Sequence, residues 1–141
     1  MKERILEVLA SLGFIIDHIE GDNIAFDFED CRIIMVQNQE DEHFLFLTIP
    51  CIVNNTELSG QELADIMNIA NYELRFTKTY CPNGEDVWMA YEYEVLNDTE
   101  DLEVILTHMI QNLALGKKYI DKLFIAAYQR KHPEGMPEDH S

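Results

Sequence analysis

The sequence predicts an α+β domain in which an antiparallel sheet packs against helices, and three observations support this class. Short segments with strand-like alternation of apolar and polar residues are interleaved with three segments of helical periodicity. The strand segments come in pairs joined by short turns, which is typical of antiparallel pairing. The 141-residue chain is 47% hydrophobic, which is enough for an independent core. The expected order is helix, three or four strands, helix, two strands and a long C-terminal helix.

The N-terminal part of the chain predicts a helix followed by a hairpin. Residues 1–12 place apolar side chains at helical spacing, and Gly13 follows as a C-terminal cap. Residues 14–20 are rich in isoleucine, and residues 23–29 alternate between apolar and polar side chains. The Gly-Asp pair between them is typical of a two-residue turn. These two segments therefore predict a hairpin with one solvated face.

The middle of the chain predicts two further strands and a second helix. Residues 32–37 and 44–53 are apolar at consecutive positions, so we expect both strands to be covered on both sides. Ser59 and Glu62 fit a capping box, and the leucines beside them fit a hydrophobic staple. The second helix therefore begins there, and its apolar periodicity ends near Tyr72.

The C-terminal part of the chain predicts a second hairpin and a long helix. Residues 74–81 and 86–95 read as strands around a turn that contains proline and glycine. Asp98 or Thr99 is expected to cap the final helix, whose apolar stripe continues for more than twenty residues. A glycine at position 116 suggests a break in this helix.

Length and composition predict one domain over residues 1–130 and a polar, disordered tail over residues 131–141. Three cysteines form an odd set without C-x-x-C spacing, so we expect free thiols in a reducing compartment. The N-terminus lacks the apolar run of a secretory signal, and no stretch reaches the roughly 18 to 20 apolar residues of a membrane span. We therefore expect a cytoplasmic protein without a membrane partner.

The charge balance limits the classes of partner. Lysine and arginine supply 10 residues and aspartate plus glutamate 27, which gives a net charge of -17. A field of this sign attracts basic partners and repels nucleic acid. The six glycines are scattered singly and form no phosphate-binding loop, so nucleotide enzymes are disfavoured as well.

The sequence contains no motif that predicts catalysis, a metal or a cofactor. None of the five histidines lies in an H-E-x-x-H motif. His43 follows three acidic residues, but their spacing matches no calcium loop, and a solvated loop is the favoured interpretation. Asp27 and Glu29 resemble paired carboxylates, yet they more simply mark the wet face of the first hairpin. Cys81 lies beside acidic residues that oppose thiolate formation. We therefore predict no enzyme, no cofactor and no metal.

The strand at residues 86–95 provides the main candidate for a contact surface. Trp88, the single tryptophan of the sequence, points away from the apolar row of this strand. Aromatic residues are enriched at interfaces, so Trp88 and Tyr80 are expected to mark a dimer or partner contact. The alternative is that the final helix covers Trp88 within one subunit. Phe46 and Tyr91 complete the predicted partner-binding residues.

Four short motifs add a resemblance to a known family. They are Leu12-Gly13-Phe14, Gly21-Asp22-Asn23-Ile24, Phe44-Leu45-Phe46-Leu47 and Ile69-Ala70-Asn71. With the order of elements, they make residues 1–128 resemble the YbjN-like bacterial family, described as regulators of sensory transduction, and the type III secretion chaperone-like fold. The resemblance implies a convex sheet with helices packed on it, a tendency to dimerise, and binding of an extended stretch of another protein. It supplies no catalytic residue.

We therefore predict a homodimeric, non-enzymatic module that acts as a chaperone-like or regulatory protein-binding domain. A partner segment, preferably basic, would be held by strand-edge hydrogen bonds and apolar pockets. One alternative is an acidic immunity or antitoxin protein that neutralises a basic partner. A small metal-dependent enzyme is the other, and it would require Asp27 and Glu29 to converge with a histidine around a cation.

Overall fold

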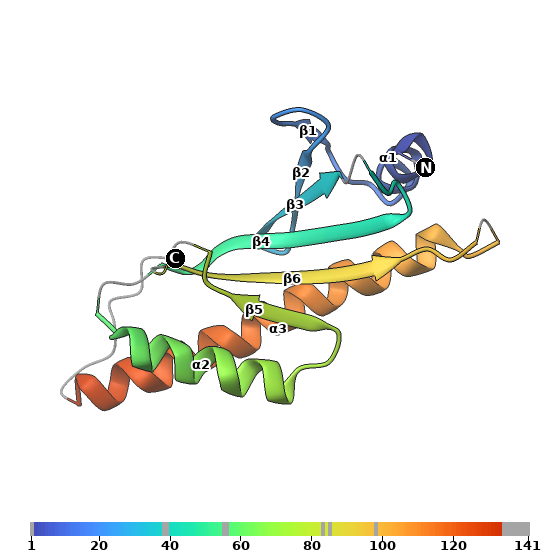
Figure 1. The fold of residues 1–141 in the computed structure, drawn as a ribbon. Helices are drawn as coiled ribbons and strands as arrows, with labels where there is room; N and C mark the ends of the chain where they lie inside the picture. Colours follow the sequence, from blue (N-terminus) through green and yellow to red (C-terminus); the bar gives the residue numbers. More distant parts are fainter. Residues whose placement is uncertain are drawn as a thin grey trace.

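The computed structural model contains one antiparallel sheet with helices packed against it (Figure 1). It describes residues 2–37, 40–54, 57–82, 84, 86–97 and 99–133, without the side chains of residues 51, 53 and 54. Over these residues the sheet has six strands, in the order β1-β2-β3-β4-β6-β5. The predicted α+β layout is confirmed: three or four strands were expected before the second helix, the structure has four, and two follow it. In chain order the elements are α1 (Lys2–Ser11), β1 (Asp17–His18), β2 (Ile24–Phe28), β3 (Cys31–Gln37), β4 (Phe44–Asn54), α2 (Gly60–Glu73), β5 (Thr77–Tyr80), β6 (Asp86–Glu94) and α3 (Leu102–Lys131).

The strand register assigns the buried side chains to one face of the sheet, which we call the covered face. Leu47 in β4 pairs with Met35 in β3 and with Tyr91 in β6, and all three side chains are buried. Two residues before Tyr91 on the same face, Met89 packs against α3 at Gly116. The hydrophobic core therefore lies between this face and the helices.

All three helices lie on the covered face. Figure 1 shows α2 beside the C-terminal half of α3, and both helices contact the sheet. Asn71 of α2 binds the backbone of Thr79, which pairs with Met89 and so faces the same side. The segment after α1 places the ring of Phe14 4.9 Å from that of Phe26 in β2. No helix among the residues that the structure describes packs on the opposite face, which we call the open face.

The two longer helices begin with side-chain caps, one of which was predicted. Ser59 Oγ accepts from the backbone N–H of Glu62 at 3.1 Å, and Glu62 Oε1 accepts from the N–H of Ser59 at 3.0 Å, so the capping box is confirmed. The predicted cap of the final helix is wrong. Asp101 caps α3 by accepting from two backbone N–H groups at 3.0 and 3.3 Å. Thr99 precedes the helix in a turn, where its backbone N–H donates to the side chain of Asn97 at 3.0 Å. Asp98 lies outside the described residues.

The expected break at Gly116 is also wrong, because α3 continues without interruption to Lys131. A Cβ atom at Gly116 would lie 2.7 Å from Met89 Sδ and 2.9 Å from its Cε. Glycine inside a helix costs about 1 kcal/mol relative to alanine. Here the missing side chain lets β6 and α3 approach closely, and the contact offsets that cost.

Two expectations about the strands are corrected by the structure. The segment at residues 14–20 forms a strand only at Asp17–His18. The strands β3 and β4 are not covered on both sides, since Val36 on the open face is 37% exposed and Phe46 is half-buried. Their consecutive apolar residues supply one core face and one exposed apolar patch.

Residues 134–141 lie outside the described residues, so the tail and its boundary stay predictions.

Candidate binding surfaces

Three of the four predicted contact residues lie together on the open face. Trp88 and Tyr80 are cross-strand partners in β6 and β5, with ring centroids 6.2 Å apart. Phe46 lies on the same face of β4, and Val36 of β3 is its cross-strand partner. Because β3 also carries Ile34 on this face, the apolar surface extends over four strands. We call Ile34, Val36, Phe46, Tyr80 and Trp88 the open-face patch.

The floor of the open-face patch is formed by Thr48 and Ala90, which pair across β4 and β6 and are buried. Thr48 Oγ1 donates to the carbonyl of Met89 at 2.8 Å. Its single proton is thereby used, so the hydroxyl of Tyr80, 3.0 Å away, donates to Thr48. This bond fixes the Tyr80 ring over the floor. Because Trp88 lies on the open face, the final helix does not cover it, and the alternative of a tryptophan buried under that helix is wrong. Its buried indole N–H has no hydrogen-bond partner among the described residues.

Charged side chains surround the open-face patch, and they are mostly acidic. The guanidinium of Arg32 pairs with Asp17 at 2.6 Å and with Asp27 at 3.3 Å. Lys78 pairs with Glu92 at 2.5 Å. Both cations are thus neutralised by neighbouring carboxylates, and negative charge remains in excess. By register, the charged residues of this face are Asp17, Asp27, Arg32, Lys78, Asp86, Glu92 and Glu94.

Tyr91, the fourth predicted residue, lies on the covered face and forms part of a different cluster. Its hydroxyl is 3.0 Å from Nδ1 of His108 in α3. The ring of Phe76 stacks on the Tyr91 ring, with centroids 5.8 Å apart and 7° between planes. His108 meets Phe76 edge-on at 4.9 Å. Desolvation raises the pKa of Tyr91, so its hydroxyl stays neutral at physiological pH.

These rings border a cavity of about 330 Å³ between β6, the segment before β5 and α3. Phe76 is 60% exposed at its mouth and has a backbone φ of 73°. This left-handed conformation is an outlier for a bulky L-residue and costs roughly 1–3 kcal/mol. Stacking on Tyr91 and His108 holds the ring in place. We call Phe76, Tyr91, Tyr93, Val104, Ile105 and His108 the aromatic pocket.

A buttressed carboxylate lies next to the aromatic pocket. The hydroxyl of Tyr93 donates to Glu100 Oε1 at 2.6 Å, and the backbone N–H of Leu96 donates to Glu100 Oε2 at 2.6 Å. The Tyr93 bond is the main reason that the pKa of Glu100 is lowered, and the same bond raises the pKa of Tyr93. Glu100 is therefore a fixed negative charge beside the pocket.

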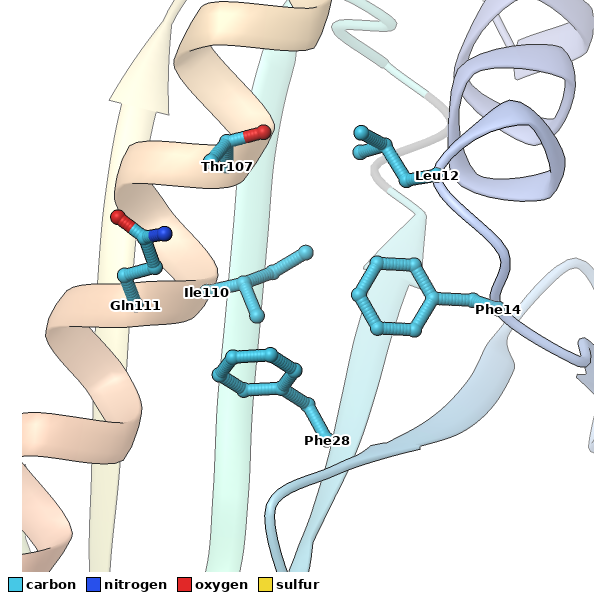
Figure 2. A pocket seen from close by; sticks show the side chains of 6 residues that line it. All are labelled: Leu12, Phe14, Phe28, Thr107, Ile110 and Gln111. Carbon is cyan, nitrogen blue, oxygen red and sulfur yellow. The ribbon is translucent and has the colours of Figure 1, made fainter.

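A second hollow, of about 150 Å³, lies between the segment after α1, the end of β2 and α3. Figure 2 shows Phe14, Phe28 and Ile110 facing one another across it, while the amide of Gln111 points away. The rings of Phe14 and Phe28 meet edge-on at 6.0 Å. Among the described residues no charged side chain lines this hollow, and its polar side chains are Thr107 and Gln111 alone, so we interpret it as an open end of the core.

The residues weighed as catalytic or metal-binding candidates do not converge. Asp27 pairs with Arg32, whereas Glu29 pairs with Lys118 at 3.4 Å. The described part of the chain contains no cluster of three histidine, cysteine, aspartate or glutamate side chains that could hold an ion. Burial raises the pKa of the Cys31 thiol, which disfavours the reactive thiolate.

No family model and no curated protein matches the chain. Among solved structures, it is similar to an uncharacterized protein from Methanothermobacter thermautotrophicus. The two chains share 16% identity and a TM-score of 0.60 over 86% of this chain and 94% of that one. This likeness shows the fold alone, and the YbjN-like resemblance stays a prediction. None of the helices in the described ranges is long and apolar enough to cross a membrane.

Proposed function

We propose that this protein is a non-enzymatic, chaperone-like or regulatory binding module of the cytoplasm, which holds an apolar segment of a basic partner protein on its open face. The observation that carries the proposal is the open-face patch. It combines a tryptophan, a tyrosine and a phenylalanine with two aliphatic residues over four neighbouring strands. Tryptophan and tyrosine are the residues most enriched at the energetic centres of interfaces.

The charge around the open-face patch supports a basic partner. Seven charged residues lie on this face, of which five are acidic and two are basic. The whole chain carries -17, so two copies repel each other at long range. A partner with lysine or arginine beside an apolar segment gains attraction at the rim and apolar burial at the centre. We therefore favour such a partner over a second copy of this chain.

The face of the sheet suits this role better than the edge at β5. The side-chain amide of Asn71 accepts from the N–H of Thr79 at 2.7 Å and donates to its carbonyl at 3.3 Å. It thereby occupies backbone groups through which an added strand would pair. The predicted strand-edge mode is thus disfavoured at β5, and side-chain burial on the open face takes its place in the proposal.

The test uses synthetic peptides and the fluorescence of Trp88, the single tryptophan of the sequence. One tryptophan-free peptide has an apolar centre flanked by lysines, and a second has the same centre flanked by glutamates. We expect a saturable change in Trp88 emission with the basic peptide, and affinity about tenfold or more weaker with the acidic one. Affinity for the basic peptide should fall with added salt.

The matched variants are Val36→Glu, on the open face, and Leu115→Glu on α3, where the side chain is 62% exposed. Each adds one negative charge to an exposed apolar position, but only Val36→Glu should abolish peptide binding. Equal loss in both variants, or no saturable signal with either peptide, contradicts the proposal.

The predicted homodimer remains a proposal of its own, tested by sedimentation over a range of concentrations. Self-association that Val36→Glu removes and Leu115→Glu keeps would identify a second copy as the occupant of the open face. That result would overturn the basic-partner proposal.

A further inference from the structure

The aromatic pocket lies on the other side of the sheet from the open-face patch, and its arrangement is that of a preorganised binding site. Phe76 is held at the surface in a left-handed backbone conformation, against Tyr91 on one side and His108 on another. A residue that only completed the core would be buried in a relaxed conformation. Strained residues of this kind cluster at ligand clamps.

The electrostatics of the aromatic pocket favour a cation. Its lining includes three benzenoid rings, and the faces of such rings attract cations through their quadrupoles. Glu100 is fixed beside it by Tyr93. An adjoining hollow, which shares Val104 and His108 with the pocket, is lined by Asp101 and Glu103. Arg75 directly precedes Phe76 in the sequence, and its single positive charge stands against the three carboxylates of Glu100, Asp101 and Glu103.

The polar groups of the pocket restrict the kind of cation. The hydroxyl of Tyr91 is engaged with His108, and the hydroxyl of Tyr93 donates to Glu100. The remaining lining residues, Phe76, Val104 and Ile105, are apolar. A lysine ammonium brings three N–H donors and a guanidinium five, whereas the side chains that line the pocket offer as acceptors only the remaining lone pairs of the tyrosine oxygens and of His108, so these donors would regain only part of their hydration. A trimethylammonium group has no donor, and its methyl groups pack well against aromatic and aliphatic walls.

We propose that the aromatic pocket binds a trimethylammonium group, carried by a free small molecule or by a trimethylated lysine side chain. The site is independent of the open-face patch, because the two clusters share no residue and face opposite sides of the sheet. Quaternary ammonium recognition by aromatic clusters is an established use of cation–π attraction.

The test is an NMR titration of the full chain at constant ionic strength, followed at the ring protons of His108. The probes are choline and N-acetyl-trimethyllysine methylamide. The matched controls are 3,3-dimethylbutanol, the uncharged carbon analogue of choline, and N-acetyl-lysine methylamide. We expect saturable His108 shifts with the cationic methylated probes, at dissociation constants on the order of millimolar. The uncharged analogue should bind roughly threefold to thirtyfold more weakly.

Two variants locate the site. Phe76→Leu keeps apolar bulk but removes the ring, and it should weaken choline binding by at least about threefold. Tyr80→Leu makes the same kind of change on the open face and should leave choline binding unchanged. The indole signal of Trp88 serves as an internal control, since it reports on the other face and should not shift.

The outcomes separate the two sources of the cation and can overturn the site. Choline binding as tightly as the trimethyllysine probe indicates a free small molecule, whereas preference for the lysine probe indicates a modified side chain. Equal binding of choline and its uncharged analogue would show an apolar hollow without cation recognition, and would refute the proposal. So would the absence of a saturable His108 shift, or a Phe76→Leu variant that binds like the wild type.

Discussion

The two faces of this sheet are built from alternate residues of the same strands, but the described helices cover only one of them. In β4, Leu47 points into the covered face and is fully buried, while its neighbour Phe46 lies half-buried on the open face. Both are large and apolar, so hydrophobicity alone does not separate them. The difference comes from the helices, which pack on one side only. An apolar strand residue is therefore part of the core or of the surface according to the face that the helices cover.

The largest expected effect is a direct test of this contrast between adjacent residues. Leu47→Ala removes a fully buried side chain from the covered face and should lower the free energy of unfolding by about 2–5 kcal/mol. Phe46→Ala removes a larger side chain from the open face and should cost about 1 kcal/mol or less. Urea unfolding followed by circular dichroism measures both values, without relying on the nearby tryptophan.

Which of the two substitutions lowers the free energy of unfolding more shows whether the open face is exposed in solution. If Phe46→Ala destabilises the isolated chain as much as Leu47→Ala does, the open face is covered in solution. A second copy would then be the simplest cover, and the cost should depend on protein concentration.

A smaller effect is expected from the polar clamp that joins the covered face to the edge of the sheet. Asn71 of α2 makes hydrogen bonds to both backbone groups of Thr79, and its Oδ1 also accepts from Thr79 Oγ1 at 2.9 Å. Asn71→Ala should lower the free energy of unfolding by about 1–2 kcal/mol, because these partners lose their bonds. It should also speed hydrogen exchange at the Thr79 amide, and expose the β5 edge to association.

Asn68→Ala is the matched control, since Asn68 lies one turn earlier in α2 and is exposed. It should change the free energy of unfolding by no more than about 0.5 kcal/mol. Similar costs for the two variants, with Thr79 exchange unchanged, would show that Asn71 does not protect the edge.

Much of the fold could be predicted because its signals are local. The capping box at Ser59 and the alternation around Trp88 each lie within a few residues of sequence. The turn from β2 to β3 was not predicted, because its residues carry no local turn signal. Glu29 and Asp30 adopt φ angles of 46° and 63° there, which a short hairpin turn requires but which glycine or asparagine usually provides. Strand pairing imposed that conformation on residues without the usual turn signal.

The candidate sites divide in the same way. Trp88, Tyr80 and Phe46 were found from strand periodicity and aromatic character, which place residues on a face. The aromatic pocket was missed, although Tyr91 was named. Phe76 lies in a turn and His108 in a helix that begins after another loop, so their meeting depends on tertiary packing. No periodic pattern links residues that far apart.

The smallest effect concerns the latch between Tyr93 and Glu100 beside the aromatic pocket, and it is read from pH dependence. The pKa of Glu100 is lowered in the folded protein, first by the Tyr93 hydrogen bond and then by the Leu96 N–H. Its contribution to stability is therefore present above the unfolded pKa, about 4.3, and is lost as pH falls through the folded value. The pKa of Tyr93 is raised, so its contribution is present below about 10 and is lost as pH rises through the folded value.

Melting temperatures across pH measure both limbs. Glu100→Gln should flatten the acid limb, because glutamine does not titrate. Tyr93→Phe should soften the alkaline limb without flattening it, since the pKa of Tyr91 is also raised, by desolvation. Glu103→Gln removes the same charge three residues further on, from an exposed position, and is the charge-matched control, which should change the acid limb less than Glu100→Gln does. An acid limb that responds equally to both glutamine substitutions would reflect net charge alone, and the Tyr93–Glu100 latch would then contribute nothing specific to the covered face.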